Sequence, residues 1–286
     1  MISAQRKASQ AAERALLCAA LALAGAAGCA RAEDRPLWEA GIGATVLSFP
    51  DYRGSNERRP WVLPFPYLIY RGDFLQADER RVRGLLAKLD RVELDASFNA
   101  TVPVKSGENQ ARQGMPDLDP TLEIGPSLNV MLAQSDNRWT QFELRLPVRA
   151  VVATDLRHAA FAGWVFEPSL NLDVQGVFGT GLRFGALAGP MFSDRRHNEY
   201  FYSVDPTFAT PERPAYSPGG GYAGTQLILT LSKRFRDVWI GGFVRWDTLK
   251  NAAFDNSPLV KTSQYFASGI AAAWILGEST AKVPMR

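Results

Sequence analysis

The strongest constraint on this chain is a long, strict alternation of apolar and polar residues. In RVELDASFNATVPV (residues 91–104), every second residue from Val92 to Val102 is apolar, and the residues between them are polar. A repeat of two places these side chains on opposite faces of a β-strand. The apolar face of this strand must therefore lie against either a protein core or lipid.

The same alternation recurs along most of the chain. Comparable runs are found at 37–49, 121–133, 140–153 and 163–176, and further strands fit at about 61–70, 180–192, 221–235, 237–249 and 263–276. No amphipathic helix is predicted after residue 32. Many long alternating runs are typical of an all-β protein, either a closed barrel or a sandwich.

The connections between these strands alternate in length. Those at 135–137, 176–180 and 236–237 are short, whereas those at 50–60, 104–120, 193–219 and 250–262 are long and rich in Pro, Asn, Asp and Gly. Transmembrane barrels have short periplasmic turns and long outer loops. All long loops fall on one side if residues 73–87 form two short strands with a tip near 78–80. We therefore predict an antiparallel up-and-down transmembrane β-barrel of about 12 strands, with ten as the alternative.

Strand length favours lipid over a protein core. Runs such as 37–49 and 140–153 reach or exceed the roughly 9–11 residues that cross a bilayer as a tilted strand. Aromatic residues also lie near the predicted strand ends, as expected for interfacial girdles; they are Trp38, Phe49, Trp61, Trp139, Trp164, Phe192, Trp246 and Trp274. A soluble sandwich, in which the polar face is the solvated outside, is the alternative.

The polar faces carry charges of both signs in mid-strand. A barrel lumen tolerates such charges because they pair or meet water there. The lumen-facing candidates are Glu93, Asp95, Glu123, Glu143, Arg145, Arg149, Glu167, Asp173, Arg183 and Arg245.

The N-terminus predicts export. A basic start precedes a run of small and apolar residues, and Ala30-Arg31-Ala32 has the form of a signal-peptidase site. Residues 1–32 are therefore predicted to be a signal peptide, and 33–286 an outer-membrane barrel with a short tail at 277–286. Processing as a lipoprotein at Cys29 is the alternative.

Removal of this leader changes the charge balance. The leader holds four of the 32 Lys and Arg residues and one of the 29 Asp and Glu residues, which leaves 28 of each. A nearly neutral chain gives no reason to expect nucleic acid as a partner. Both cysteines, Cys18 and Cys29, also lie in the leader.

Several motifs resemble those of one family. GIGATVLSFPDYRGS (41–55), PFPYLIYRGDFL (64–75), YFYSV (200–204), YSPGGGYAG (216–224) and DNSPLV (255–260) occur in the order found in the MipA/OmpV family of outer-membrane proteins. This resemblance implies a non-catalytic barrel in the Gram-negative outer membrane. Some members are linked to assembling murein synthases with lytic transglycosylases, and others to adhesion, osmotic response or antibiotic susceptibility; of these roles we expect the scaffold. Outer-membrane lipid, lipopolysaccharide and murein enzymes are the expected partners.

The loop motif Pro50, Asp51, Tyr52, Gly54 and Ser55 has two readings. It could bind a ligand, but Pro, Gly and Asp are also the residues that set a tight turn. We favour the turn. No cofactor or metal site is predicted, because the chain has only two histidines and no mature cysteine.

Two functions compete with a scaffold. One is a narrow pore for small solutes, since about twelve strands lie between filled eight-stranded barrels and open porins. The other is a lipid hydrolase that uses Ser193 and His197, oriented by Asp194 or Glu199. Catalysis requires the base to lie within hydrogen-bond reach of the nucleophile, which spacing alone does not show, so we predict that the chain is not an enzyme.

Overall fold

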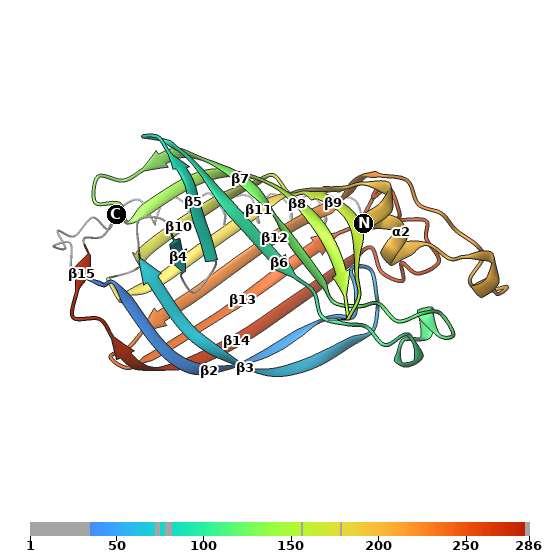
Figure 1. Ribbon diagram of the computed structural model, residues 1–286, viewed down its shortest axis with the longest axis horizontal. Coiled ribbons are helices and arrows are strands. Elements are labelled where there is room, and N and C mark those ends of the chain that lie inside the picture. Colours follow the sequence, from blue (N-terminus) through green and yellow to red (C-terminus); the bar gives the residue numbers. More distant parts are fainter. Residues whose placement is uncertain (1–34, 72–74, 78–81, 156, 178, 284–286) are drawn as a thin grey trace, which may run out of the picture.

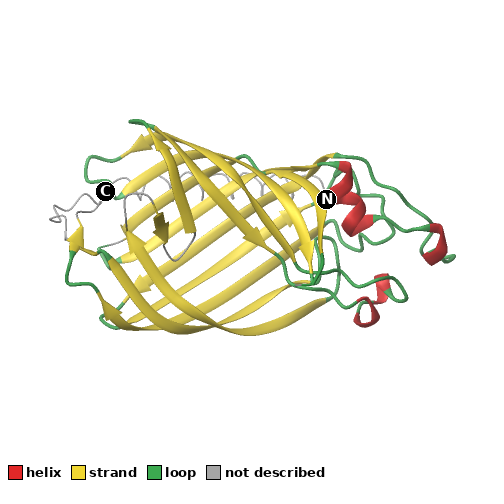
Figure 2. Cartoon of the chain, in the orientation of Figure 1, coloured by secondary structure: helices red, strands yellow, loops and turns green. Residues whose placement is uncertain are grey.

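The computed structural model describes residues 35–71, 75–77, 82–155, 157–177 and 179–283. The predicted signal peptide and the predicted tip near residues 78–80 lie outside these ranges. The described chain forms a barrel of tilted strands, and its short helices lie in the loops at one end (Figures 1 and 2).

Fifteen strands are present in the described residues. They are β1 (Arg35–Pro36), β2 (Trp38–Pro50), β3 (Arg58–Arg71), β4 (Leu75–Ala77), β5 (Val82–Lys88), β6 (Val92–Ala100), β7 (Thr121–Gln134), β8 (Thr140–Thr154), β9 (Ala159–Phe166), β10 (Ser169–Val177), β11 (Leu182–Ser193), β12 (Gly221–Arg234), β13 (Val238–Thr248), β14 (Gln264–Glu278) and β15 (Lys282–Val283).

The strand pairings form a closed antiparallel ring. From β2 each wall strand pairs with the next along the chain, and β14 returns to pair with β2. β9 and β10 both pair with β8 on one side and β11 on the other, so they act as one wall strand interrupted at Glu167 and Pro168. The wall therefore has twelve strands. The predicted all-β, up-and-down barrel of about 12 strands is confirmed.

One strand boundary was wrong. The strand run predicted at 163–176 begins earlier in the structure, because β9 begins at Ala159. Gly163 adopts φ +106°, and the register with β8 shifts there. This bulge breaks the alternation that located the strand in the sequence.

The short hairpin needed for the even strand count is present. β4 pairs with β3 only at Tyr70 and Arg71, and with β5 over its three residues. β5 then pairs with the start of β6. These strands bring every long connection to one end of the barrel.

The wall separates an apolar outside from a polar inside. Outward side chains such as Ile42, Phe98 and Ile270 are 61%, 53% and 68% exposed, whereas inward Asp95 and Glu123 are buried. This arrangement is the reverse of a soluble protein and is the pattern of a barrel surrounded by lipid. In the part of the chain that the structure describes, no helix has the length and apolar character needed to cross a membrane.

The inner wall uses glycine to make room for aromatic rings. A Cβ added at Gly43 would lie 2.6 Å from the Phe65 ring, and one at Gly269 would lie 2.6 Å from the Phe243 ring. The Gly-rich start of β2 thus lets a ring lie flat on the wall. Two expected girdle residues also belong to this inner face, since Phe49 lines the lumen and Trp61 pairs with the inward Leu47.

The two ends of the barrel differ. At one end, β15 from the predicted tail pairs with β1, so part of residues 277–286 lies against Arg35–Pro36. At the other end the loops carry a short helix, α2 (Arg195–Tyr202), and the 3₁₀ turns η1 (Ser106–Glu108), η2 (Gln110–Arg112) and η3 (Pro206–Phe208). The helix was not predicted, because eight residues are too few to show a helical period.

Candidate functional site: the capped lumen

The long loops pack into a cap over one mouth of the barrel. The main cluster of buried apolar residues lies here and joins loop residues to the loop ends of strands. Its members include Tyr52, Val104, Leu118, Tyr202, Leu249, Phe254 and Leu259. Tyr202 and Phe254 stack with ring centroids 3.7 Å apart. The loops therefore have a core of their own and are not loose connections.

Arg53 lies at the centre of the cap. Its guanidinium donates to the Ala223 carbonyl at 2.8 Å and forms an ion pair with Asp247 at 3.0 Å. Its own carbonyl accepts a hydrogen bond from the Tyr202 hydroxyl at 3.0 Å. Burial alone would lower the pKa of Arg53, but Tyr265, Asp247 and Tyr202 outweigh it and raise the pKa. Arg53 therefore remains charged and joins three loop or strand segments.

Two further arginines hold loop carbonyls. Arg112 donates to the carbonyls of Phe201 and Pro116 at 3.2 and 3.1 Å. Arg213 donates to the Ala111 carbonyl at 3.1 Å and to the Phe208 carbonyl at 2.7 Å. Such bonds satisfy backbone groups that irregular loops would otherwise bury unpaired.

The motif loop 50–55 is a structural part of this cap. Gly54 adopts φ +94°, and its carbonyl accepts from the Lys261 and Thr262 amides at 2.7 and 3.1 Å. The Tyr52 hydroxyl donates to the Leu259 carbonyl at 2.8 Å. The Asn109 amide donates to Asp51 at 2.9 Å and to Ser55 at 3.2 Å. Pro50 lies at the end of β2 and is buried. The motif thus connects the loop at 104–120 with the loop at 250–262.

The predicted lumen charges form clusters. Arg149 pairs with Glu123 at 2.8 Å and also with Glu167. Arg145 pairs with Glu143 at 2.9 Å and with Asp173 at 3.6 Å. Because charges removed from water are costly unless they are paired, these contacts are what make a charged interior tolerable.

The other candidates lie on the same inner face. Asp95 is buried, and Glu93 and Arg183 are partly buried. Arg245 bonds to Asp247 at 3.0 Å, which brings it beside Arg53.

Two charged residues of the inner face were not predicted. Asp247 is fully buried between Arg53 and Arg245, although its alternation with Arg245 could have revealed it. Glu39, at the other end of the barrel, pairs with Arg71 at 2.7 Å and with Arg234 at 3.2 Å. Glu39 is on the polar face of the run 37–49, so the same alternation could have identified it as an inner charge.

A cavity of about 340 Å³ lies beneath the cap. Its lining includes Leu47 and Phe49 of β2, Asn99 and Ala100 of β6, Phe243 of β13 and His197 of α2. Within the described residues, His197 Nδ1 has no hydrogen-bond partner. Burial, with a smaller effect of Arg53, lowers the pKa of His197 to about 4, so its ring is neutral near pH 7.

The geometry around His197 does not form a nucleophile–base pair. The Ser193 hydroxyl donates to Asn198 Oδ1 at 2.5 Å, and Asp194 caps α2 by accepting the His197 backbone amide at 2.8 Å. The His197 ring instead lies 5.1 Å from the Phe201 ring. His158 is on the surface beside Asp155. Among the described residues, no group of three or more His, Cys, Asp or Glu side chains is placed to hold a metal.

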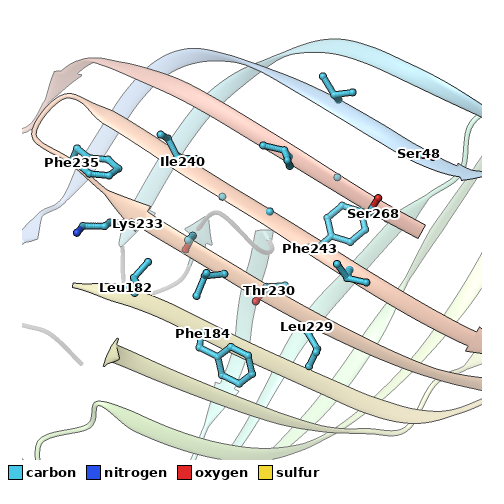
Figure 3. Close-up of a pocket in the computed structure, with 18 residues that line it drawn as sticks. Ser48, Leu182, Phe184, Leu229, Thr230, Lys233, Phe235, Ile240, Phe243 and Ser268 are labelled. Carbon is cyan, nitrogen blue, oxygen red and sulfur yellow. The ribbon is translucent and has the colours of Figure 1, made fainter. Parts of the chain in front are cut away.

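A second hollow lies on the outside of the wall. It runs across β11–β14 and β2, with Leu229, Leu231 and Ile240 around Gly242 (Figure 3). Gly242 pairs with Leu231 and Ile270, both of which point outward. The hollow therefore lies where an outward position lacks a side chain.

The sequence of this chain matches a known family. The family model described as MltA-interacting protein MipA matches residues 42–276. The chain belongs to the MipA family. This match covers nearly the whole barrel wall, so it confirms the resemblance drawn from the motifs. No curated protein matches the chain.

Solved structures resemble the chain only distantly. A structure titled "CymD monoaromatic hydrocarbon channel" has 10% identity over 87% of this chain and 68% of that chain, with a TM-score of 0.25. The Ralstonia pickettii toluene transporter TbuX has 9% identity over 89% of this chain and 72% of that chain, with a TM-score of 0.27. Values this low carry no inference about function.

Proposed function

We propose that this MipA-family barrel is a structural scaffold in the outer membrane of a Gram-negative bacterium. It links murein synthases and lytic transglycosylases at the cell envelope. The observation that carries the proposal is the packed cap, since it covers one mouth of a barrel whose inner face along β7 and β8 is already occupied by ion pairs. A barrel of this kind is better suited to holding partners than to passing solutes.

The lipid-facing wall and the predicted leader support the proposed outer-membrane location. Outward apolar side chains on successive strands require lipid, and a signal peptide at residues 1–32 would deliver the chain across the inner membrane. With the termini toward the periplasm, the cap faces outward, where lipopolysaccharide surrounds it. Murein enzymes would then meet the short-turn end.

We infer that the barrel has no catalytic activity. The Ser193 hydroxyl donates to Asn198, and the His197 ring lies beside Phe201, so the two side chains do not form a nucleophile–base pair. Purified barrel mixed with phospholipid should release no fatty acid. Release that is lost in His197→Gln would identify a hydrolase instead.

The scaffold is tested by isolating the barrel with its partners. A tagged chain purified from crosslinked envelopes should carry a murein synthase and a lytic transglycosylase above the level seen with an unrelated outer-membrane barrel. Equal recovery from both barrels would contradict the scaffold.

A narrow channel is the second candidate, and the 340 Å³ cavity favours it. If the cap opens, this cavity becomes a path for small solutes. Planar-bilayer recording separates the two functions. Steady ion-selective steps from the unmodified barrel would favour the channel, whereas a silent barrel supports the scaffold.

A further inference from the structure

The cavity beneath the cap is lined by side chains from both the wall and the loops. Leu47 of β2 and Phe243 of β13 contribute from the wall, and Tyr202 and Phe254 contribute from the cap. Small-molecule sites are concave and mostly apolar, with a few placed polar groups, and measure roughly 300–1,000 Å³. The volume of about 340 Å³ is therefore large enough for one small ligand.

The wall side of the cavity is an apolar surface that lies close to the backbone. A Cβ added at Gly269 of β14 would lie 2.6 Å from Leu47 Cδ2 and 2.6 Å from the Phe243 ring. Both side chains therefore lie across the backbone of Gly269, where no side chain holds them away. Aromatic rings favour offset-stacked or edge-to-face contact with one another, so this surface suits a flat apolar ring.

The charged groups of the lining are already paired. Each of the three carboxylates that line the cavity, those of Asp51, Glu123 and Glu167, pairs with an arginine. The two arginines that line it both pair with Asp247. An ionic ligand would have to share counter-ions that the protein already uses, so the lining favours an uncharged molecule.

The uncharged polar groups of the lining also have partners, with the exception of His197. The Ser193 hydroxyl donates to Asn198 Oδ1, and Asn198 Nδ2 donates to the Gly219 carbonyl at 2.7 Å. The other groups with partners are the hydroxyls of Tyr52, Thr101, Tyr202 and Tyr265 and the amide of Asn99.

His197 is the polar side chain of the lining whose bonding is incomplete. It is 8% exposed, and within the described residues its Nδ1 has no hydrogen-bond partner. A buried polar atom without a partner is costly and uncommon in folded proteins, so it points to a group that supplies the missing bond. The ring is neutral near pH 7 and has one donor and one acceptor nitrogen. A hydroxyl group can serve either nitrogen, because it both donates and accepts.

We propose that this cavity binds one small uncharged molecule of the phenol class, in which a flat apolar ring carries a hydroxyl group. The ring lies on Leu47 and Phe243, and the hydroxyl bonds to the imidazole of His197. The proposal does not depend on the scaffold role, since the barrel alone supplies the lining.

Equilibrium dialysis of 1-naphthol against the processed barrel in lipid nanodiscs at pH 7 tests the site, and empty nanodiscs correct for uptake by lipid. One saturable site per barrel is expected. Ala267 is buried and lines the cavity, so Ala267→Leu should weaken binding by roughly tenfold or more. Ala44→Leu, on the exposed lipid face of β2, is the matched control and should leave binding unchanged. Heat-modifiable gel mobility shows that each variant is folded.

Naphthalene, which lacks the hydroxyl, tests the hydrogen bond to His197. The ratio of 1-naphthol affinity to naphthalene affinity should fall roughly fivefold in His197→Phe, as expected for the loss of one hydrogen bond. The ratio should stay the same in His158→Phe, because His158 is exposed. The anion 1-naphthalenesulfonate should bind more weakly than 1-naphthol.

Four results would overturn the proposal. The first is the absence of a saturable site in the unmodified barrel, as expected if water alone fills the cavity. The second is unchanged binding in Ala267→Leu, and the third is an unchanged affinity ratio in His197→Phe. The fourth is tighter binding of the sulfonate than of 1-naphthol, which would identify an anion site instead.

Discussion

Single residues of the cap join loops that are far apart in sequence. Tyr202 stacks on Phe254 and donates to the Arg53 carbonyl, while its own carbonyl accepts from Ser257 at 2.7 Å. Burial raises the pKa of Tyr202, so the hydroxyl stays protonated and remains a donor. The loops from 51, 194 and 249 onward thus meet at this one ring.

Removing that ring should loosen the cap. Tyr202→Ala deletes a buried aromatic side chain, which costs about 3–5 kcal/mol, whereas Tyr202→Phe keeps the stack and loses one hydrogen bond, about 1 kcal/mol. Urea unfolding in liposomes measures both. Planar-bilayer recording of Tyr202→Ala should also show flickering conductance. Equal stability of the two variants would mean that the stack does not hold the cap.

His197 should make the cap sensitive to acid. Its pKa is about 4 when folded and 6.5 by its ordinary value, so the unfolded chain binds the proton more readily. Its contribution to stability is complete above about pH 6.5 and is lost as the pH falls toward 4. The charges around it are Arg53, which opposes protonation, and Asp194 and Glu167, which favour it.

Protease sensitivity of the loops between pH 7 and 4 measures this effect. His197→Gln should reduce the rise in cleavage as the pH falls. His158→Gln is the control, because His158 is exposed. An identical pH profile for His197→Gln and the unmodified barrel would contradict this role.

At the scale of elements, the alternation predicted the strands and the inner charges but not the cap. A repeat of two marks each strand and its polar face, so β7 and β8 and their Glu123 and Arg149 were identifiable. Arg53 was not identifiable, because it pairs with Asp247 from a loop. No repeat in the sequence shows which strand a loop residue contacts. Phe49 lies on the same face of β2 as the inward Glu39, because both are odd-numbered. Its position near the strand end had suggested a lipid-facing girdle instead.

The packing of β2 on β3 depends on glycine. Gly43→Val should clash with the Phe65 ring, which already lies within 2.6 Å of the position of an added Cβ. Overpacking of this kind costs about 1–3 kcal/mol. Phe65→Ala in the same chain should relieve the clash, and urea unfolding compares the single and double variants. A double variant less stable than the sum of the single changes would exclude this explanation.

The Arg149 cluster holds β7, β8 and the interruption before β10 together. Arg149→Met leaves Glu123 and Glu167 without their shared cation and should cost about 3–5 kcal/mol. Adding Glu123→Gln and Glu167→Gln should restore much of the loss. Folding yield and urea unfolding report both changes, and no loss in Arg149→Met would show that water already compensates these carboxylates.

The whole molecule consists of a lipid-facing wall, an interior with paired charges and a cap over one mouth. Ile270 points outward from the middle of β14 and is 68% exposed. Ile270→Arg should cost roughly 2–4 kcal/mol near the bilayer midplane and impair insertion. Ile270→Ala, which adds no charge, should insert normally.

Envelope fractionation combined with heat-modifiable gel mobility measures whether this chain is a folded barrel in the outer membrane. We predict that the chain is found in the outer-membrane fraction and migrates as a compact band that shifts on boiling. A soluble periplasmic chain with no shift would contradict it.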